Sequence, residues 1–103
     1  MSSSIPHWPY DQPRNCATFT LRQVMEKTEP ILRVTHDSED HGWQFIGSTD
    51  ANMKDAMLVS LEEVVSLDLS VLEVADLPPG WQATRESPVH PWVRSVHSEE
   101  DEE

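Results

Sequence analysis

A short segment of the chain, residues 36–41, gathers side chains that can bind metal ions or transfer protons. It holds two imidazoles and three carboxylates in six residues. Imidazole nitrogens and carboxylate oxygens are ligands for zinc and other divalent ions. In a turn between two strands, the two imidazoles can face each other. This pattern gives one functional hypothesis, a metal-dependent enzyme, with the ligand candidates His36, Asp37, Asp40 and His41.

The same segment also fits a solvent-exposed hairpin turn. Acidic side chains in turns often accept hydrogen bonds from nearby backbone N–H groups. A working metal site needs a fixed ligand geometry and supporting hydrogen bonds behind the ligands, and a short acidic turn shows no sign of either. The spacing of the acids does not match an EF-hand loop. The metal-dependent enzyme therefore stays the alternative to a turn without catalytic function.

Other catalytic signatures are absent from the sequence. It has no Gly-x-Ser-x-Gly nucleophile motif, and its three glycines form no glycine-rich phosphate loop. The single cysteine, Cys16, lies in an apolar run and is expected to be a small buried hydrophobic residue. We predict no catalytic residue and no cofactor.

Tryptophan is frequent, with four residues in a chain of 103. Trp43 and Trp81 each follow a glycine and precede a glutamine, and both fall in predicted strands. Such side chains either fill the core or form an aromatic contact surface, because tryptophan is enriched among the residues that dominate binding energy. Together with the acidic turn they give the predicted binding residues, which are Asp37, Glu39, Asp40, Trp43 and Trp81.

The charge balance is strongly acidic, with a net charge of −12 at pH 7. The C-terminal residues are an acidic run, but the rest of the chain is acidic as well. This argues against nucleic acid and anionic membranes as partners, because binding to both requires lysine and arginine to replace counterions. It favours a basic protein partner. A third hypothesis is mimicry of nucleic-acid charge, which requires acids at near-regular spacing along one face.

The sequence also bears on location. No apolar run approaches the ~20 residues of a membrane-spanning helix. The first residues lack the positive charge and the apolar stretch of a secretory signal. We therefore expect a cytoplasmic protein with no membrane contact.

Two segments share one pattern, in which a short apolar strand leads through a hydroxyl residue into apolar residues at helical spacing. Residues 15–19 are expected to form a strand, with Thr20 as the N-cap of a helix. Residues 57–59 form the second such strand, and Ser60 caps a helix with Glu63 at the capping-box position. The apolar helix faces are Leu21, Val24 and Met25 in the first copy and Leu61, Val64 and Val65 in the second. The repeat is either a duplication or the ordinary pattern of capped helices.

Three further strands are expected at residues 31–35, 43–46 and 81–85, and Asp68 is expected to cap a further helical turn. The predicted fold is α+β, with a mainly antiparallel sheet of four or five strands and two short helices on one face. The expected order of elements is β-α-β-β-β-α-α-β.

The length of the chain fits one domain. Residues 1–13 are rich in serine and proline and are expected to be an irregular arm. Residues 14–95 form the predicted domain. Residues 96–103 are expected to be a disordered tail, because a run of acids cannot join a core. A domain of this size has a small margin of stability, so we expect a monomer or a weak homodimer.

Three stretches resemble the signature of a family of small bacterial proteins of unknown function. They are residues 30–37 with Gly42-Trp43-Gln44-Phe45, residues 77–85, which read Leu-Pro-Pro-Gly-Trp-Gln-Ala-Thr-Arg, and Pro91-Trp92-Val93-Arg94. The resemblance covers roughly residues 8–95. It departs from the family pattern at Leu69, where that pattern has a proline suited to the first helical position.

Similar domains are assigned by genome context to immunity proteins for polymorphic toxins. The resemblance therefore implies a bacterial, immunity-like protein, and it supplies no catalytic residues. With the acidic charge and the tryptophans, it leads to the main functional prediction, a non-enzymatic binding module for an unidentified protein partner.

Overall fold

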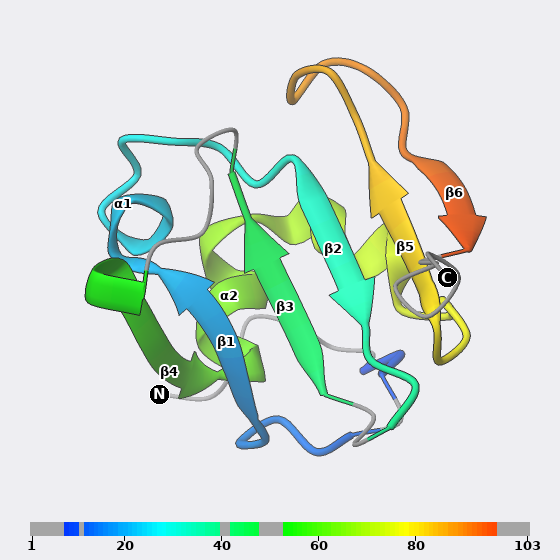
Figure 1. Cartoon of the computed structure of the whole chain (residues 1–103), viewed down its shortest axis with the longest axis horizontal. Coiled ribbons are helices and arrows are strands. Elements are labelled where there is room, and N and C mark those ends of the chain that lie inside the picture. The colour runs from blue at the N-terminus through cyan, green and yellow to red at the C-terminus, as the bar shows by residue number, and fades with distance from the viewer. Residues whose placement is uncertain (1–7, 11, 40–41, 48–52, 97–103) are drawn as a thin grey trace.

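The fold is built on one six-stranded β-sheet, seen in a computed structural model that describes residues 8–10, 12–39, 42–47 and 53–96 (Figure 1). The strands are β1 (Ala17–Leu21), β2 (Arg33–His36), β3 (Trp43–Ile46), β4 (Ala56–Ser60), β5 (Trp81–Thr84) and β6 (Val93–Val96). The helical segments of the described residues are α1 (Arg22–Met25), η1 (Met53–Asp55), α2 (Leu61–Leu67) and η2 (Leu69–Val74), of which η1 and η2 are 3-10 helices. The predicted α+β class is confirmed.

The strand order is β4-β1-β3-β2-β5-β6, and the sheet differs from the predicted one in two respects. It has six strands rather than four or five, because β6 pairs antiparallel with β5. It is also mixed, since β1 and β3 run parallel while every other pairing is antiparallel. As a result β1 lies between β3 and β4, two strands that follow each other along the chain.

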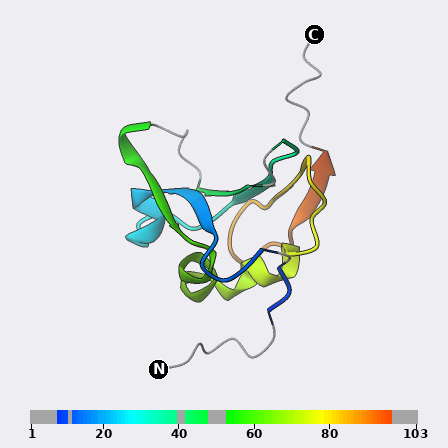
Figure 2. The same ribbon diagram turned by 90° about the horizontal axis from the view of Figure 1, so that it is seen from below.

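One face of the sheet is covered by α2 and η2 (Figure 2). Alternate strand residues point to this side, as the register shows for Val34, which lies opposite Phe45 in β3 and Ala83 in β5. All three are fully buried. The helices contribute the buried residues Leu61, Val64, Val65, Val71 and Val74. Burial of each such aliphatic side chain stabilises the fold by roughly 1.5–3 kcal/mol.

The opposite face is not covered by α2 or η2, and we call it the open face (Figure 2). In the register, Phe19 lies opposite Gln44 and Leu58, and Thr35 lies opposite Gln44 and Gln82. The open face consists of Ala17, Phe19, Leu21, Arg33, Thr35, Gln44, Ile46, Ala56, Leu58, Ser60, Gln82, Thr84, Val93 and Ser95, of which Leu21, Thr35 and Ile46 are buried. Leu58 and Val93, near its two edges, are 75% and 60% exposed.

The start of α2 agrees with the sequence prediction. The Ser60 hydroxyl accepts a hydrogen bond from the Glu63 backbone N–H, and the Glu63 carboxylate accepts one from the Ser60 N–H, each at 3.2 Å. Asp68 caps the next segment, η2, by accepting from the Ser70 N–H at 3.0 Å. These contacts satisfy N–H groups that a helix leaves without an internal partner.

The prediction that Thr20 caps the first helix is wrong. Thr20 is a fully buried residue inside β1, and its hydroxyl donates to the Phe45 carbonyl oxygen in β3 at 2.7 Å. The N-cap of α1 is Leu21, which makes no side-chain capping bond, and the helix has only four residues. Pairing with β4 extends over all five residues of β1, so the strand continues past the expected helix start.

The segment expected to be an irregular arm is partly packed on the core. Tyr10 is buried and donates its hydroxyl to the Val71 carbonyl oxygen at 2.8 Å. Cys16, expected to be buried, is half-buried, because it lies just before β1 begins. Residues 97–103 of the expected tail lie outside the described residues. No helix in the described part of the chain is long and apolar enough to cross a bilayer.

Candidate functional site

His36 and Trp43 lie on the covered face, where they stack on each other. Their ring centroids are 4.0 Å apart and their planes differ by 15°. His36 is 5% exposed and Trp43 is 2% exposed. The His36 Nδ1 atom lies 2.7 Å from the Leu77 carbonyl oxygen, and because a carbonyl only accepts, Nδ1 carries the proton.

Trp43 is held in place by further contacts within the core. The Tyr10 ring meets it edge to face at a centroid distance of 4.9 Å, and its own Nε1–H donates to the Gln12 side-chain oxygen at 2.8 Å. Aromatic pairs of this geometry contribute roughly 0.5–1.5 kcal/mol beyond their buried area. Trp43 therefore belongs to the core, but it also lines a hollow of about 160 Å³ together with Asp37, so its place among the binding residues stays a prediction.

Burial has an electrostatic consequence for Tyr10. Desolvation raises the pKa of its hydroxyl well above the ordinary value, because an ionised phenolate would lose its hydration in the core. The hydroxyl therefore stays protonated and remains a hydrogen-bond donor to Val71 at neutral pH. Its role here is structural.

Asp37 faces away from His36. It lines a hollow of about 160 Å³ together with Phe19, Trp43, Gln44 and Leu58. His36 lines a separate cavity of about 490 Å³ beside Leu77 and the two prolines that follow it. Successive strand residues point to opposite faces, which accounts for the separation. The structure therefore does not bring these two metal-ligand candidates together.

The rest of the predicted acidic site is described only in part. The Asp37 carboxylate accepts a hydrogen bond from the Glu39 backbone N–H at 2.7 Å, which is the turn-stabilising contact expected of such an acid, and Glu39 is exposed. Asp40 and His41 lie outside the described residues. Among the residues that the structure describes, no group of three or more His, Cys, Asp or Glu side chains is arranged to hold a metal ion.

Trp81, another predicted binding residue, is the first residue of β5 and is half-buried on the covered side. It lies opposite His36 in β2 and Val96 in β6, and packs against the core. Its exposed part belongs to the opposite side of the sheet from Asp37. The predicted binding residues therefore do not form one surface.

Arg85 is a buried cation directly after β5 and is not one of the predicted binding residues. Its side chain is 2% exposed, and its Nη2 forms an ion pair with Asp68 at 3.0 Å. Its Nε and Nη2 donate to the Ile31 carbonyl oxygen, and its Nη1 donates to the Ser70 hydroxyl at 2.9 Å. The guanidinium carbon lies 4.2 Å from the centre of the Trp92 ring.

This arrangement satisfies the charge of a buried guanidinium, so Arg85 links four separate segments of the chain rather than binding a ligand. The sequence pattern around Arg85 indicates that its side chain is buried. Arg85 is two residues after Ala83, so the alternation of a strand places it on the covered face. An arginine at such a position needs a carboxylate partner, which here is Asp68.

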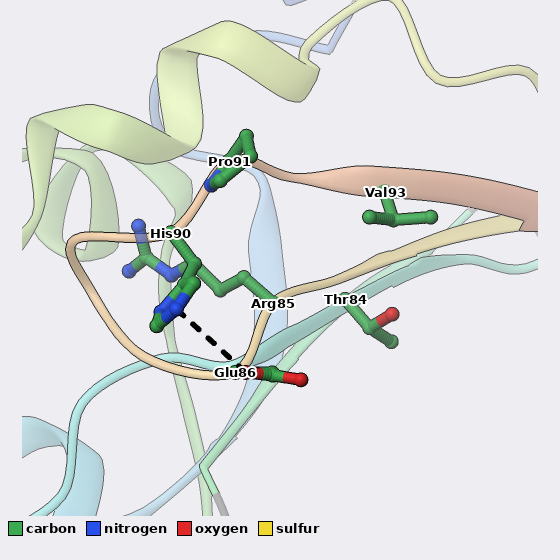
Figure 3. Close-up of a pocket in the computed structure, with 6 residues that line it drawn as sticks. All are labelled: Thr84, Arg85, Glu86, His90, Pro91 and Val93. Carbon is green, nitrogen blue, oxygen red and sulfur yellow. Dashed lines mark ion pairs between the residues drawn. The ribbon is translucent and has the colours of Figure 1, made fainter.

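A cavity of about 470 Å³ lies beside Arg85, under the loop that joins β5 to β6 (Figure 3). In this loop His90 lies between two polar side chains, with Nδ1 at 2.7 Å from the Ser87 hydroxyl and Nε2 at 3.6 Å from the Glu86 carboxylate. The three residue types match those of a serine–histidine–acid triad. A triad, however, uses a buried acid to hold the imidazole, whereas the Glu86 side chain is 87% exposed.

The Ser87 hydroxyl also accepts a hydrogen bond from the Val89 N–H at 3.3 Å. We therefore interpret the Ser87–His90 contact as a stabilising element of the loop. Thr84 and Val93 of the open face are among the residues that line the cavity.

No protein-family model, no curated protein and no solved structure matches this chain.

Proposed function

We propose that this chain is a non-enzymatic protein-binding module and that a basic protein partner docks on the open face of its sheet. The observation that carries the proposal is the distribution of charge. Arg33 is the only charged side chain among the strand residues of the open face, although the chain has 19 acidic residues. Protein interfaces are depleted of charged residues at their centre, so a charge-poor face on an acidic protein is a suitable docking surface.

The apolar part of this face is its end near β1 and β4. Phe19 and Leu58 lie opposite each other across the strands, next to Gln44. They line the hollow of about 160 Å³ described above, which can receive the end of one side chain of a partner. A shallow apolar hollow surrounded by polar side chains is a common form of anchor site.

The charge of the partner follows from the border of this hollow. Asp37 lines it, and Glu39 is exposed in the turn that follows. Both are predicted binding residues and both remain in the proposal. A basic side chain seated in the hollow meets Asp37, and the net charge of −12 increases the rate of encounter with a basic protein.

The resemblance to small bacterial proteins of the immunity type fits this proposal, because an immunity protein acts by binding another protein. We carry the bacterial, cytoplasmic and immunity-like assignments forward as expectations. The metal-dependent enzyme at residues 36–41 gains no support from the described residues, because His36 and Asp37 line different cavities.

The test is capture of a partner from a lysate of the native host by the full chain. Asp37→Lys should abolish retention of any specific partner, since it places a cation against a basic ligand at the hollow. Glu73→Lys is the matched control, because it makes the same change at an exposed residue of η2 on the covered side. Retention by the wild type and the control but not by Asp37→Lys, with loss at high salt, supports the proposal. Equal retention by both variants would refute it.

A further inference from the structure

The cavity of about 490 Å³ beside His36 has walls from three separate segments of the chain, and we call it the proline cavity because Pro9, Pro78 and Pro79 line it. Small-molecule sites are typically clefts of roughly 300–1,000 Å³, lined mainly by apolar groups with a few polar ones. The proline cavity has this composition, since its lining is apolar apart from Gln12, His36 and Asp76.

The wall formed by the turn between η2 and β5 is fixed by backbone hydrogen bonds. The Gly80 N–H donates to the His36 carbonyl oxygen at 2.7 Å, which joins the turn to the end of β2. The Leu77 N–H donates to the Val74 carbonyl oxygen at 3.1 Å, which joins it to η2. A wall that is already in place need not be ordered when a ligand binds, and this favours affinity.

The wall formed by the N-terminal segment is fixed as well. The Gln12 side-chain oxygen accepts from the Trp43 Nε1–H at 2.8 Å, and the Gln12 carbonyl oxygen accepts from the Trp8 Nε1–H at 2.7 Å. Tyr10, in the same segment, donates its hydroxyl to the Val71 carbonyl oxygen at 2.8 Å. The cavity therefore lies between anchored segments.

His36 gives the cavity a polar group that is itself buried. Its ring is held by the 2.7 Å contact of Nδ1 with the Leu77 carbonyl oxygen and by stacking on Trp43. A few polar groups in fixed positions within an apolar lining set the orientation of a bound ligand. His36 is such a group.

Asp76 decides which charge the cavity accepts. It carries the only formal charge among the lining residues, and its side chain is 77% exposed. Arg94 holds the carboxylate in position through a 2.7 Å hydrogen bond, but Arg94 does not line the cavity. A ligand inside therefore meets the carboxylate, whose two oxygens have room for further hydrogen bonds.

We propose that the proline cavity binds a small organic cation, an amine or amidine carried on an apolar ring. The cationic group donates to Asp76, and the ring lies against the apolar walls. An anionic ligand is disfavoured, because it would meet the Asp76 carboxylate on a chain with a net charge of −12. This site is independent of the proposed protein partner, since Asp37 lines a different hollow.

The experiment is a titration of the full chain with benzamidine, followed by NMR at about 0.15 M salt. We expect saturable shifts with a dissociation constant of about 1 mM, as suits so small a ligand. The signals that move should include the His36 ring, the backbone amides of residues 75–80 and the Trp43 indole N–H, which is bonded to Gln12 in the cavity wall. Benzamide, with the same shape and no charge, should bind more weakly, and benzoate should not bind.

Two variants separate the cavity from general attraction of a cation to an acidic protein. Asp76→Asn keeps the shape of the side chain but removes its charge, and should raise the dissociation constant about fivefold. Glu73→Gln is the matched control, because it makes the same change at an exposed residue that does not line the cavity, and it should bind as the wild type does. Circular dichroism should show the wild-type fold in both.

Four results would each overturn the proposal. They are no saturable shift with benzamidine, equal binding of benzoate, an equal dissociation constant in Asp76→Asn and the wild type, and shifts that leave out the His36 ring and the Trp43 indole. The last of these would place the cation on the acidic surface instead of in the cavity.

Discussion

The two faces of the sheet use opposite kinds of side chain. The covered face buries polar and charged groups that each have a defined partner, such as Thr20 with the Phe45 carbonyl and Arg85 with Asp68. The open face exposes apolar groups, such as Leu58, among uncharged polar ones. Leu58 and Val93 are the exposed apolar groups near the two edges of the open face, whereas Leu21 and Ile46 on the same face are buried. Stability should therefore depend on the first face and association on the second.

The largest difference between the faces should appear on removing an aromatic ring from the core. Trp43→Ala leaves a cavity and ends the stacking with His36 and Tyr10, so it should lower the free energy of unfolding by about 3–5 kcal/mol. Leu58→Ala on the open face should change it by less than about 0.5 kcal/mol. Chemical denaturation of both variants measures this, and equal losses would show that the open face also carries the fold.

A second test compares a buried ion pair, Arg85 with Asp68, with an exposed one, Arg94 with Asp76. Asp68→Ala leaves the buried Arg85 guanidinium without its carboxylate and should lower the free energy of unfolding by about 2–3 kcal/mol. The matched control is Asp76→Ala, which removes the partner of Arg94, where the Asp76 side chain is 77% exposed. That change should cost less than about 1 kcal/mol. Thermal and chemical unfolding of the two variants measures the loss in free energy of unfolding. Equal losses in Asp68→Ala and Asp76→Ala would contradict the prediction.

The smallest effect concerns pH. Because burial raises the pKa of Tyr10 in the folded state, its contribution to stability is fully present below its unfolded pKa near 10 and is lost as the pH rises above that value. Above that pH, the free energy of unfolding should fall by up to about 1.4 kcal/mol per pH unit. Tyr10→Phe should cost about 1 kcal/mol at pH 7, from the hydrogen bond to Val71, and should remove this added slope.

Tyr10 is the only tyrosine in the chain, so tyrosinate absorbance reports its ionisation directly. Ionisation of the folded protein near pH 10 would show that the hydroxyl is not desolvated. An unchanged pH slope in Tyr10→Phe would place the alkaline loss of stability on other groups.

The sequence predicted elements whose signals are local. The capping box of Ser60 and Glu63 is formed by two residues three apart, and it stands as predicted. The strand Trp43–Ile46 also has the predicted bounds, because a short apolar run bounded by a glycine on each side has few alternatives.

Thr20 shows why other predictions failed. Its hydroxyl could either cap a helix or bond to a neighbouring strand, and the choice depends on Phe45, which lies 25 residues away in the chain. The parallel pairing of β1 with β3 depends on the same distant contact. The partner of Arg85 is 17 residues away, so the arginine could not be assigned to Asp68 by spacing.

The candidate site was predicted only in part for a similar reason. Asp37 lies at the hollow of the open face, but the hollow is formed by Phe19 and Leu58, which are far from it in the sequence. Trp43 was selected for its residue type, which does not tell that its ring is buried on the covered face.

The position of β1 constrains the order of assembly. Both of its neighbours, β3 and β4, come later in the chain, and the hairpin of β2 and β3 can pair without it. During synthesis β1 has no sheet partner until β3 has been made, and it is paired on both sides only once β4 follows, although it occupies an interior position of the finished sheet. Deletion of β1 would leave β4 with no strand to pair with among those described, so the first strand to be synthesised secures the last connection on that side of the molecule.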